Sequence, residues 1–227
     1  MNKEMNKKAL SIFMFLLATC IASVVQAQSL YQVEIIVFER KGLVRTLGAS
    51  QTTDGHNLAY LEPAQTLKTL EPTDAQAAPA FTLLADSELT LKPQATSLER
   101  SKQMRVLLHQ AWLQPVGRQP IGVALAGGAR FGPWSELAGT LQLSLDKTLM
   151  LNSSLWYAQF MPDNGHPITN PITIPLPPEQ GILSDAKTEG FFATLAVPFS
   201  FKQALKPGVT TYVDHPIFGL IIKVQPL

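Results

Sequence analysis

The sequence is almost free of cysteine, since Cys20 is the only one among 227 residues. Cys20 lies in an N-terminal stretch with the features of a removable leader, so we expect the mature chain to carry no thiol. This excludes disulfides, zinc–cysteine sites, iron–sulfur clusters and a cysteine nucleophile. A cysteine-free chain suits an oxidising compartment, because nothing in it can mispair. Its hydrophobic core must then hold it together.

The sequence also has little charge and no run of basic residues. Charged residues make up 15% of the chain, and the formal net charge is +1. It falls to −1 when residues 1–27 are removed, because these contain three lysines and one glutamate. Nucleic-acid binding needs a dense cationic face, so nucleic acid is not an expected partner. No second long apolar segment follows the leader, and we expect no membrane span in the mature chain.

Recognisable catalytic motifs are missing as well. Two Ser-x-x-Lys spacings occur, at Ser144 and Ser184, but neither opens a predicted helix as the penicillin-interacting serine enzymes require. There is no Gly-x-Ser-x-Gly elbow and no glycine-rich phosphate loop. None of the histidines has the i, i+4 partner of a zinc helix: His56, His109, His166 and His215. We expect a protein that is not an enzyme and has no cofactor or metal, with a divergent hydrolase as an alternative.

Residues 1–27 have the three parts of a secretory signal. They begin with a lysine-rich stretch (residues 3–8), continue with an uncharged apolar stretch (residues 9–25), and end in a small-x-small cleavage site at Ala27. We expect cleavage after Ala27 and delivery to the periplasm. Two alternatives are a retained membrane anchor and a lipoprotein with its lipid on Cys20.

The apolar patterning predicts the α+β class, with a mainly antiparallel β-sheet, one or two short helices and long loops. Tyr31–Phe38 is apolar on both faces at its far end, which indicates a central strand. The clearest hairpin joins Glu136–Leu145 to Leu149–Phe160 through a turn at Asp146-Lys147. The terminal apolar run Leu220–Val224 is expected in the core sheet. Further strands are predicted at 121–126 and 191–201.

Residues 97–113 are ambiguous. Ser97 is placed to cap a short helix that ends near Lys102. The following segment, Met104–Leu113, fits a strand by its alternation of apolar residues, with Gln110 as the exception. It also fits a helix. We favour the strand.

Two segments lack a strand pattern. Residues 44–80 are rich in Ala, Thr, Gln, Asp and Pro, and are predicted to be a long surface loop or a partly disordered insertion. Residues 162–181 are rich in proline and are predicted to be an extended connector. A glycine-rich stretch, 127–133, is expected to be a loop. Residues 28–227 are long enough for one domain or two small ones, and we expect a single periplasmic domain.

The most suggestive polar cluster is Asp214-His215-Pro216, just before the terminal strand. One interpretation is a carboxylate and an imidazole that grip a polar ligand. The favoured alternative is that Asp214 bonds the backbone of its own turn and His215 satisfies a neighbouring carbonyl. His109 is likewise better explained as a packed, hydrogen-bonded residue than as a ligand-binding one.

Aromatic residues offer a second kind of binding surface, for sugars or peptide. Such residues more often fill a core, so at most about two of the candidates are expected at a ligand surface. The candidates are Trp112, Trp134, Trp156, Tyr157 and Tyr212.

A series of short motifs, taken in order, resembles one known family. The motifs are Tyr31–Arg40, Leu98–Ser101, Arg105–Trp112 with Gln114-Pro115, the Gly-Gly-x-Arg-Phe-Gly-x-Trp stretch at 127–134, the hairpin to Trp156, and Tyr212–Gly219. Together they resemble the CsiV family of periplasmic peptidoglycan-binding proteins from gamma-proteobacteria. The resemblance covers most of the chain beyond the leader, except 44–80 and 162–190.

The resemblance implies a non-catalytic protein that binds peptidoglycan and supports cell-wall synthesis and cell shape. It also suggests assistance to a lipoprotein activator of a penicillin-binding protein, so a cell-wall synthase or its activator is a candidate partner. The alternative is an envelope adaptor between proteins that does not touch the wall. We take six residues as candidate ligand contacts: Tyr212, Asp214, His215, His109, Arg130 and Trp134.

The chain departs from the family pattern just before the terminal motif. The family tends to carry a basic Arg-x-Arg-Ser-like stretch there and a histidine beside the tyrosine. Here residues 202–211 contain fewer basic residues, and Thr211 stands beside Tyr212. If the family holds an anionic partner through those residues, this chain is expected to bind it more weakly or differently.

Overall fold

The computed structural model describes residues 29–42, 58–62, 64–65, 68–69, 81–165, 172–178 and 190–227. Several sequence-based expectations lie outside these residues. They include the leader with Cys20, most of the segment 44–80, residues 166–171 and 179–181 of the segment 162–181, and the residues His56, His166 and Ser184.

Six strands form one sheet, sheet A, in the order β10-β11-β1-β5-β4-β3. Strand β1 (Ser29–Arg40) lies between β11 (Phe218–Pro226) and β5 (Met104–Val116), antiparallel to both. The expected positions of the first and last strands are therefore confirmed, and the strand interpretation of Met104–Leu113 is also confirmed. The short strands are β10 (Thr211–Asp214), β4 (Thr82–Leu83) and β3 (Lys68–Thr69).

Five strands form the second sheet, sheet B, in the order β2-β6-β7-β8-β9. They are β2 (Ala64–Gln65), β6 (Ile121–Phe131), β7 (Trp134–Leu145), β8 (Leu149–Pro162) and β9 (Phe191–Leu205). The four long strands run antiparallel to their neighbours, and β2 is parallel to β6. The predicted hairpin is confirmed as β7 and β8.

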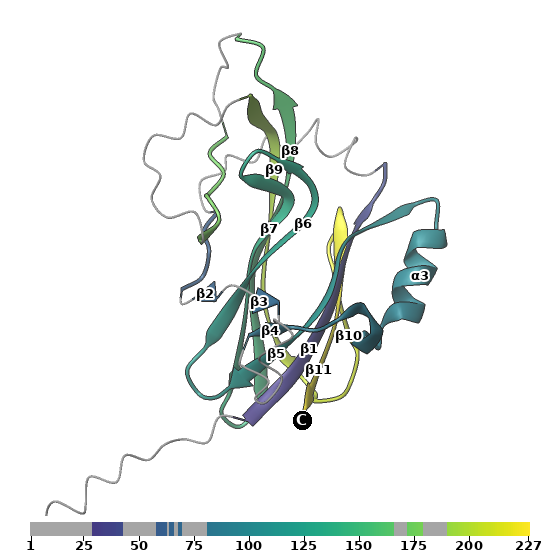
Figure 1. Cartoon of the computed structure of the whole chain (residues 1–227), viewed down its shortest axis with the longest axis vertical. Helices are drawn as coiled ribbons and strands as arrows, with labels where there is room; N and C mark the ends of the chain where they lie inside the picture. Colours follow the sequence, from purple (N-terminus) through teal and green to yellow (C-terminus); the bar gives the residue numbers. More distant parts are fainter. Residues whose placement is uncertain are drawn as a thin grey trace, which may run out of the picture.

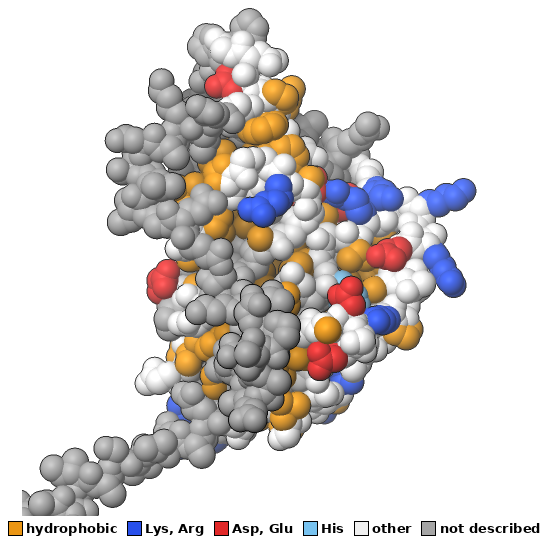
Figure 2. All heavy atoms as spheres, viewed as in Figure 1, with side chains coloured by type: hydrophobic (Ala, Val, Ile, Leu, Met, Phe, Trp, Pro, Cys, Tyr) orange, Lys and Arg blue, Asp and Glu red, His pale blue; other side chains and the backbone are white. Residues whose placement is uncertain are grey.

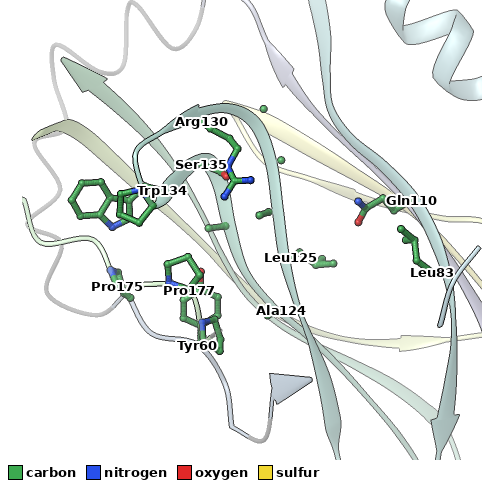
Figure 3. Close-up of a pocket in the computed structure, with 16 residues that line it drawn as sticks. Tyr60, Leu83, Gln110, Ala124, Leu125, Arg130, Trp134, Ser135, Pro175 and Pro177 are labelled. Carbon is green, nitrogen blue, oxygen red and sulfur yellow. The ribbon is translucent and has the colours of Figure 1, made fainter. Parts of the chain in front are cut away.

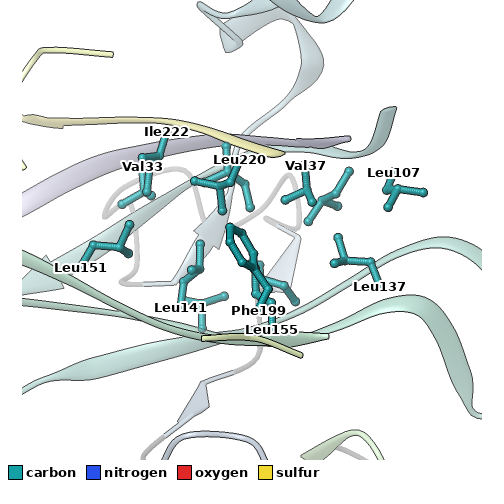
Figure 4. Packing of buried hydrophobic residues seen from close by; sticks show 14 of the residues in the cluster. Val33, Val37, Leu107, Leu137, Leu141, Leu151, Leu155, Phe199, Leu220 and Ile222 are labelled. Carbon is teal, nitrogen blue, oxygen red and sulfur yellow. The ribbon is translucent and has the colours of Figure 1, made fainter. Parts of the chain in front are cut away.

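The two sheets pack face to face, and the main core lies between them (Figure 1). Side chains alternate along each strand, so every second residue of β1 points toward sheet B. Figure 4 shows side chains from both layers meeting in this space. They include Val33, Val37, Leu220 and Ile222 of sheet A and Leu137, Leu141, Leu151, Leu155 and Phe199 of sheet B.

The outer faces of the two sheets are covered by different segments. Helix α3 (Lys92–Arg100) lies on the outside of sheet A and buries Ala95 against Ile36 and Phe38 (Figure 1). On the outside of sheet B, residues of 58–60 and 172–174 pack over Trp156. The 3-10 helix η1 (Asp86–Glu88) is the only other helix among the described residues. The expected class, mainly antiparallel β with few helices, is confirmed.

The predicted start of the helix was wrong. Helix α3 begins at Lys92, with Leu91 as its N-cap and Pro93 in its first turn, and not at Ser97. The two residues just before the helix are held from strand β1, because the carboxylate of Glu34 accepts the backbone N–H groups of Thr90 (2.8 Å) and Leu91 (2.8 Å). No local sequence pattern signals a contact of this kind.

The predicted loop at 127–133 was also wrong in most of its length. Strand β6 continues to Phe131, and only the residues before Trp134 form the turn into β7. A register shift between Gly127 and Arg130 interrupts the pairing of β6 with β7. The glycines that suggest a loop thus lie in and beside a bulge, which is where strands commonly place them.

The surface and helices of the described residues show two further features. In Figure 2, basic and acidic side chains are interspersed over the visible face, with hydrophobic side chains between them. Among the described residues, no helix is both long enough and apolar enough to cross a bilayer.

Candidate functional site

Tyr212 and Asp214 meet Arg40 at one edge of sheet A. Arg40 Nη2 donates hydrogen bonds to Tyr212 Oη (2.7 Å) and to Asp214 Oδ1 (2.6 Å). The Tyr212 hydroxyl donates to the same oxygen of Asp214 (2.6 Å). We call these three residues the terminal cluster. Sequence reasoning missed Arg40 as a member because it lies 172 residues before Tyr212.

The charges of the terminal cluster compensate one another. Hydrogen bonds from Tyr212 and Arg40 hold the pKa of Asp214 below its ordinary value. Burial and the hydrogen bond to Asp214 raise the pKa of Tyr212, and the hydrogen bond to Asp214 raises that of Arg40. At neutral pH the cluster therefore contains a carboxylate, a guanidinium and a neutral phenol. A ligand would have to compete with the bonds that already join them.

His215 turns away from the exposed cluster and toward the core. Its ring lies against Phe199 and Phe218, with centroid distances of 5.2 and 4.6 Å. Its Nδ1 accepts the backbone N–H of Ile217 (3.3 Å), while its carbonyl accepts a hydrogen bond from Arg40 Nη1. Burial lowers the pKa of His215, which favours the neutral ring. Asp214 and His215 are thus neighbours that face different surroundings.

His109 lies on the outer face of sheet A, in the same cross-strand row as Ile36, Ile221 and Tyr212. Its Nε2 is 2.9 Å from Oε1 of the buried Glu34. Burial would raise the pKa of Glu34, but hydrogen bonds from Thr90, His109 and Leu91 outweigh it and lower the pKa. The imidazole therefore has a polar partner within the fold.

A cavity of about 360 Å³ lies beside strand β6 (Figure 3). We call it the β6 cavity. Its lining combines parts of both sheets with two covering segments: Tyr60, Leu83, Gln110, the β6 residues 124–128 and 130, the β7 residues 134, 135 and 138, and Pro133, Pro175, Pro177 and Pro178. Ligand pockets usually measure about 300–1,000 Å³, so this cavity fits a small group or a short segment of a polymer.

Arg130 and Trp134, two of the candidate contacts, lie together at the β6 cavity (Figure 3). Trp134 is half-buried; its Nε1 donates to the carbonyl of Ile174 (3.3 Å) and its ring stacks on Phe160 (5.7 Å). Arg130 is exposed, and no carboxylate among the described residues forms an ion pair with it. The cavity therefore offers a fixed aromatic side chain and an available cation.

Glu136 holds the bulge that precedes Arg130. Its Oε2 accepts the backbone N–H of Ala129 (2.8 Å) and Nη2 of Arg105 (2.9 Å). Arg105 also pairs with Glu39 on β1, at 2.7 Å from Nε to Oε1. This network joins sheet A to sheet B next to the cavity. Glu136 is thus bound to Arg105 and to the backbone of Ala129, and it forms no ion pair with Arg130.

Gln110 is a lining residue that sequence reasoning missed. It shares a face of β5 with Leu108 and Trp112, which point into the core between the sheets. A polar residue on that face was the one exception in the alternation of Met104–Leu113. Gln110 breaks the pattern where β5 borders the cavity, so the exception was a signal of the site.

The aromatic candidates divide into buried core residues and residues that are at least partly exposed. Trp112, Trp156 and Tyr157 are buried in the cores, whereas Trp134 is half-buried at the cavity and Tyr212 is 49% exposed at the terminal cluster. Across the described part of the chain, no group of three or more His, Cys, Asp or Glu side chains is arranged to hold a metal ion.

The six candidate contacts therefore fall into three places and not one. Arg130 and Trp134 lie at the β6 cavity, Tyr212 and Asp214 form the terminal cluster with His215 beside them, and His109 lies on the outer face of sheet A. A search of curated proteins and a search of solved structures each found no significant match. Residues 9–227 match the family model described as "Peptidoglycan-binding protein, CsiV", and the chain therefore belongs to the CsiV family.

Proposed function

We propose that this protein binds peptidoglycan in the cell envelope and that the β6 cavity is the binding site. The observation that supports this site is that Arg130 and the half-buried ring of Trp134 both line the cavity. Among the described residues, Arg130 has no ion-pair partner. Peptidoglycan offers matching chemistry. Its sugars present apolar ring faces to aromatic side chains, and its peptides carry carboxylates for arginine.

The terminal cluster supports this proposal less well. Arg40, Tyr212 and Asp214 already satisfy one another's polar atoms, and a charged ligand would have to break those bonds. His215 packs on two phenylalanines. At the cavity, by contrast, Arg130 has no ion pair to break among the described residues.

Sedimentation with purified sacculi tests the proposal. The wild-type protein is expected in the pellet, and Arg130→Gln and Trp134→Ala are each expected to weaken binding about tenfold, the effect of losing one charged hydrogen bond or one well-packed ring. Arg100→Gln on α3 is the matched control, because Arg100 is exposed and distant from the cavity lining. Wild-type protein that stays in the supernatant at low salt would contradict wall binding.

In the cell we propose a role in wall synthesis and cell shape, together with a protein partner such as a cell-wall synthase or its lipoprotein activator. The exposed Tyr212 on edge strand β10 supports a protein contact at the terminal cluster. Crosslinking in cells, followed by digestion of the sacculi, tests this role. Partners that are lost when the sacculi are digested would be linked to this protein only through the wall. Partners that remain in the absence of any sacculus binding would favour a pure adaptor.

We further propose that the protein acts by recognition, as one exported domain that begins after Ala27. Incubation with muropeptides is expected to yield no new products, and a product would favour the hydrolase alternative. N-terminal sequencing of periplasmic protein is expected to start at Gln28. A full-length chain with its leader would contradict export by cleavage, and a lipid on Cys20 would support the lipoprotein alternative.

A further inference from the structure

In the described part of the chain, strand β6 is an edge of sheet B along most of its length. One side pairs with β7, and the other side pairs with β2 only at Gly122 and Val123. From Ala124 onward, no strand among the described residues pairs with that second side. An edge of this kind presents backbone N–H and C=O groups at a regular spacing, which is a template for a further strand.

The β6 cavity lies along this open part of the edge. Five consecutive residues of β6, 124–128, line the cavity, and all but Leu125 are alanine or glycine. Ala126 and Gly128 are exposed, Ala124 and Gly127 are half-buried, and Leu125 is buried, so the backbone of β6 is partly accessible here. At about 3.3 Å per residue, the five residues provide room for a ligand of two or three residues in extended form.

Two walls enclose the open edge. In Figure 3, Gln110 and Leu83 lie on one side of β6, while Trp134, Tyr60, Pro175 and Pro177 lie on the other. The first wall belongs to sheet A and supplies an amide. The second wall is apolar and aromatic. A segment that lay on the edge would therefore place alternate side chains against two chemically different surfaces, as in strand addition.

Arg130 lies at the end of this edge, just after the bulge. Arg40, Arg105 and Arg118 each pair with a carboxylate, but none of the described carboxylates pairs with Arg130. Glu136 lies on β7, after the turn that follows Arg130. Its side chain accepts hydrogen bonds from Arg105 and from the backbone N–H of Ala129. The charge on Arg130 therefore favours an anionic group on whatever occupies the edge.

From these observations we propose that the β6 cavity binds the stem peptide of peptidoglycan as an added strand beside residues 124–128, with the C-terminal carboxylate of the peptide on Arg130. The inference rests on the proposed function and makes it specific, because the glycan chain is then not the part that is recognised. A sugar ring can stack on Trp134, but only a peptide presents backbone N–H and C=O groups in a row that matches the edge.

The first experiment compares three ligands with the full mature protein: intact sacculi, glycan strands stripped of stem peptides by an amidase, and a synthetic stem tripeptide. Binding to stripped glycan is expected to be at least tenfold weaker than binding to sacculi, and the tripeptide is expected to compete. Equal binding to stripped glycan would overturn the stem-peptide inference while leaving wall binding intact. Failure to bind sacculi at all would instead reject the proposed function.

The second experiment changes the ligand, so that protein folding is not at issue. N-methylation of a single tripeptide amide removes one backbone donor, and amidation of the C-terminus removes a carboxylate. Methylation of at least one of the two amides is expected to weaken binding at least tenfold, because an added strand pairs its backbone N–H groups with the edge. Methylations that both leave binding unchanged would overturn strand addition.

The contact with Arg130 is tested by combining ligand and protein changes. Amidation and Arg130→Gln are each expected to weaken binding about tenfold, and together no more than either change alone, because both remove the same contact. Independent effects that multiply would overturn the assignment of Arg130. Unrelated linear peptides with a free carboxylate are expected to bind at least tenfold more weakly. Equal binding would identify a general site for protein tails and overturn the stem-peptide assignment.

Discussion

His109 Nε2 lies 2.9 Å from Oε1 of Glu34, a carboxylate whose side chain is only 2% exposed. The same carboxylate accepts hydrogen bonds from the backbone N–H groups of Thr90 and Leu91 and from the Thr90 hydroxyl. Glu34 thereby ties the beginning of helix α3 to the central strand of sheet A. A buried carboxylate with this many donors is stable in its charged form.

Glu34 should make the protein sensitive to acid. Its pKa in the folded protein lies below its ordinary value of 4.5, because the hydrogen bonds to the carboxylate outweigh the effect of burial. The unfolded chain therefore binds this proton at a higher pH than the folded chain does. The free energy of unfolding is expected to fall as the pH is lowered below about 4.5 and through the folded pKa.

Urea unfolding between pH 3 and pH 7 measures this effect. Glu34→Gln is expected to cost about 2 kcal/mol at neutral pH, the range for lost charged hydrogen bonds, and to flatten the acid limb of the profile. Glu99→Gln on the exposed face of α3 is the control and is expected to change little. An unaltered acid limb in Glu34→Gln would contradict the role of Glu34.

His215 should add a second pH dependence, at higher pH. Burial holds its pKa below the ordinary value of 6.5, so the unfolded chain takes up this proton first as the pH falls. Stability contributed by the neutral ring is present above about pH 6.5 and is lost as the pH falls toward the folded pKa. In His215→Gln, the slope of unfolding free energy against pH is expected to decrease in this window, as measured by the same urea titrations. A slope equal to that of the wild type would show that His215 is not responsible.

Arg105 should contribute more to stability than an ordinary surface arginine. It pairs with Glu39 and Glu136, whose side chains are 10% and 13% exposed and which belong to different sheets. Arg105→Ala leaves two poorly solvated carboxylates without their partner and is expected to cost about 3 kcal/mol by urea unfolding. Arg118→Ala is the matched control, because Arg118 and Asp146 are 67% and 64% exposed and such pairs contribute at most about 1 kcal/mol. Equal costs would contradict a special role for the network between the sheets.

Gly139 should tolerate no side chain. It has a φ of +133°, and a Cβ at this position would lie 2.1 Å from the Ser154 carbonyl oxygen and 2.6 Å from Leu155 Cα. Gly139→Ala is expected to destabilise the protein by about 3 kcal/mol or to prevent folding, because the backbone of β8 cannot move away cheaply. Gly132→Ala is the control for the left-handed backbone, since Gly132 has a φ of +61° and open space around it. It is expected to cost about 1 kcal/mol in thermal or urea unfolding.

The sequence alone was sufficient to locate most strands. Tyr31–Phe38, the β7–β8 hairpin and the terminal strand were predicted, because an alternation of period two is a local property of the residues themselves. It also suggested Arg130, Trp134, Tyr212 and Asp214 as candidate contacts and, through its motifs, the family. The start of helix α3 was missed, because the residues just before it are held by the Glu34 carboxylate on strand β1 and not by a local cap.

Tertiary structure decided which residues meet. No local pattern specifies that the strands divide into two sheets, since strand pairing depends on apolar faces that are far apart along the chain. Strand pairing within sheet A places Arg40 beside Asp214, and the packing of the two sheets places Gln110 of sheet A beside β6 of sheet B. These arrangements arise from burying two apolar faces against each other, and a linear sequence records the faces but not their partners.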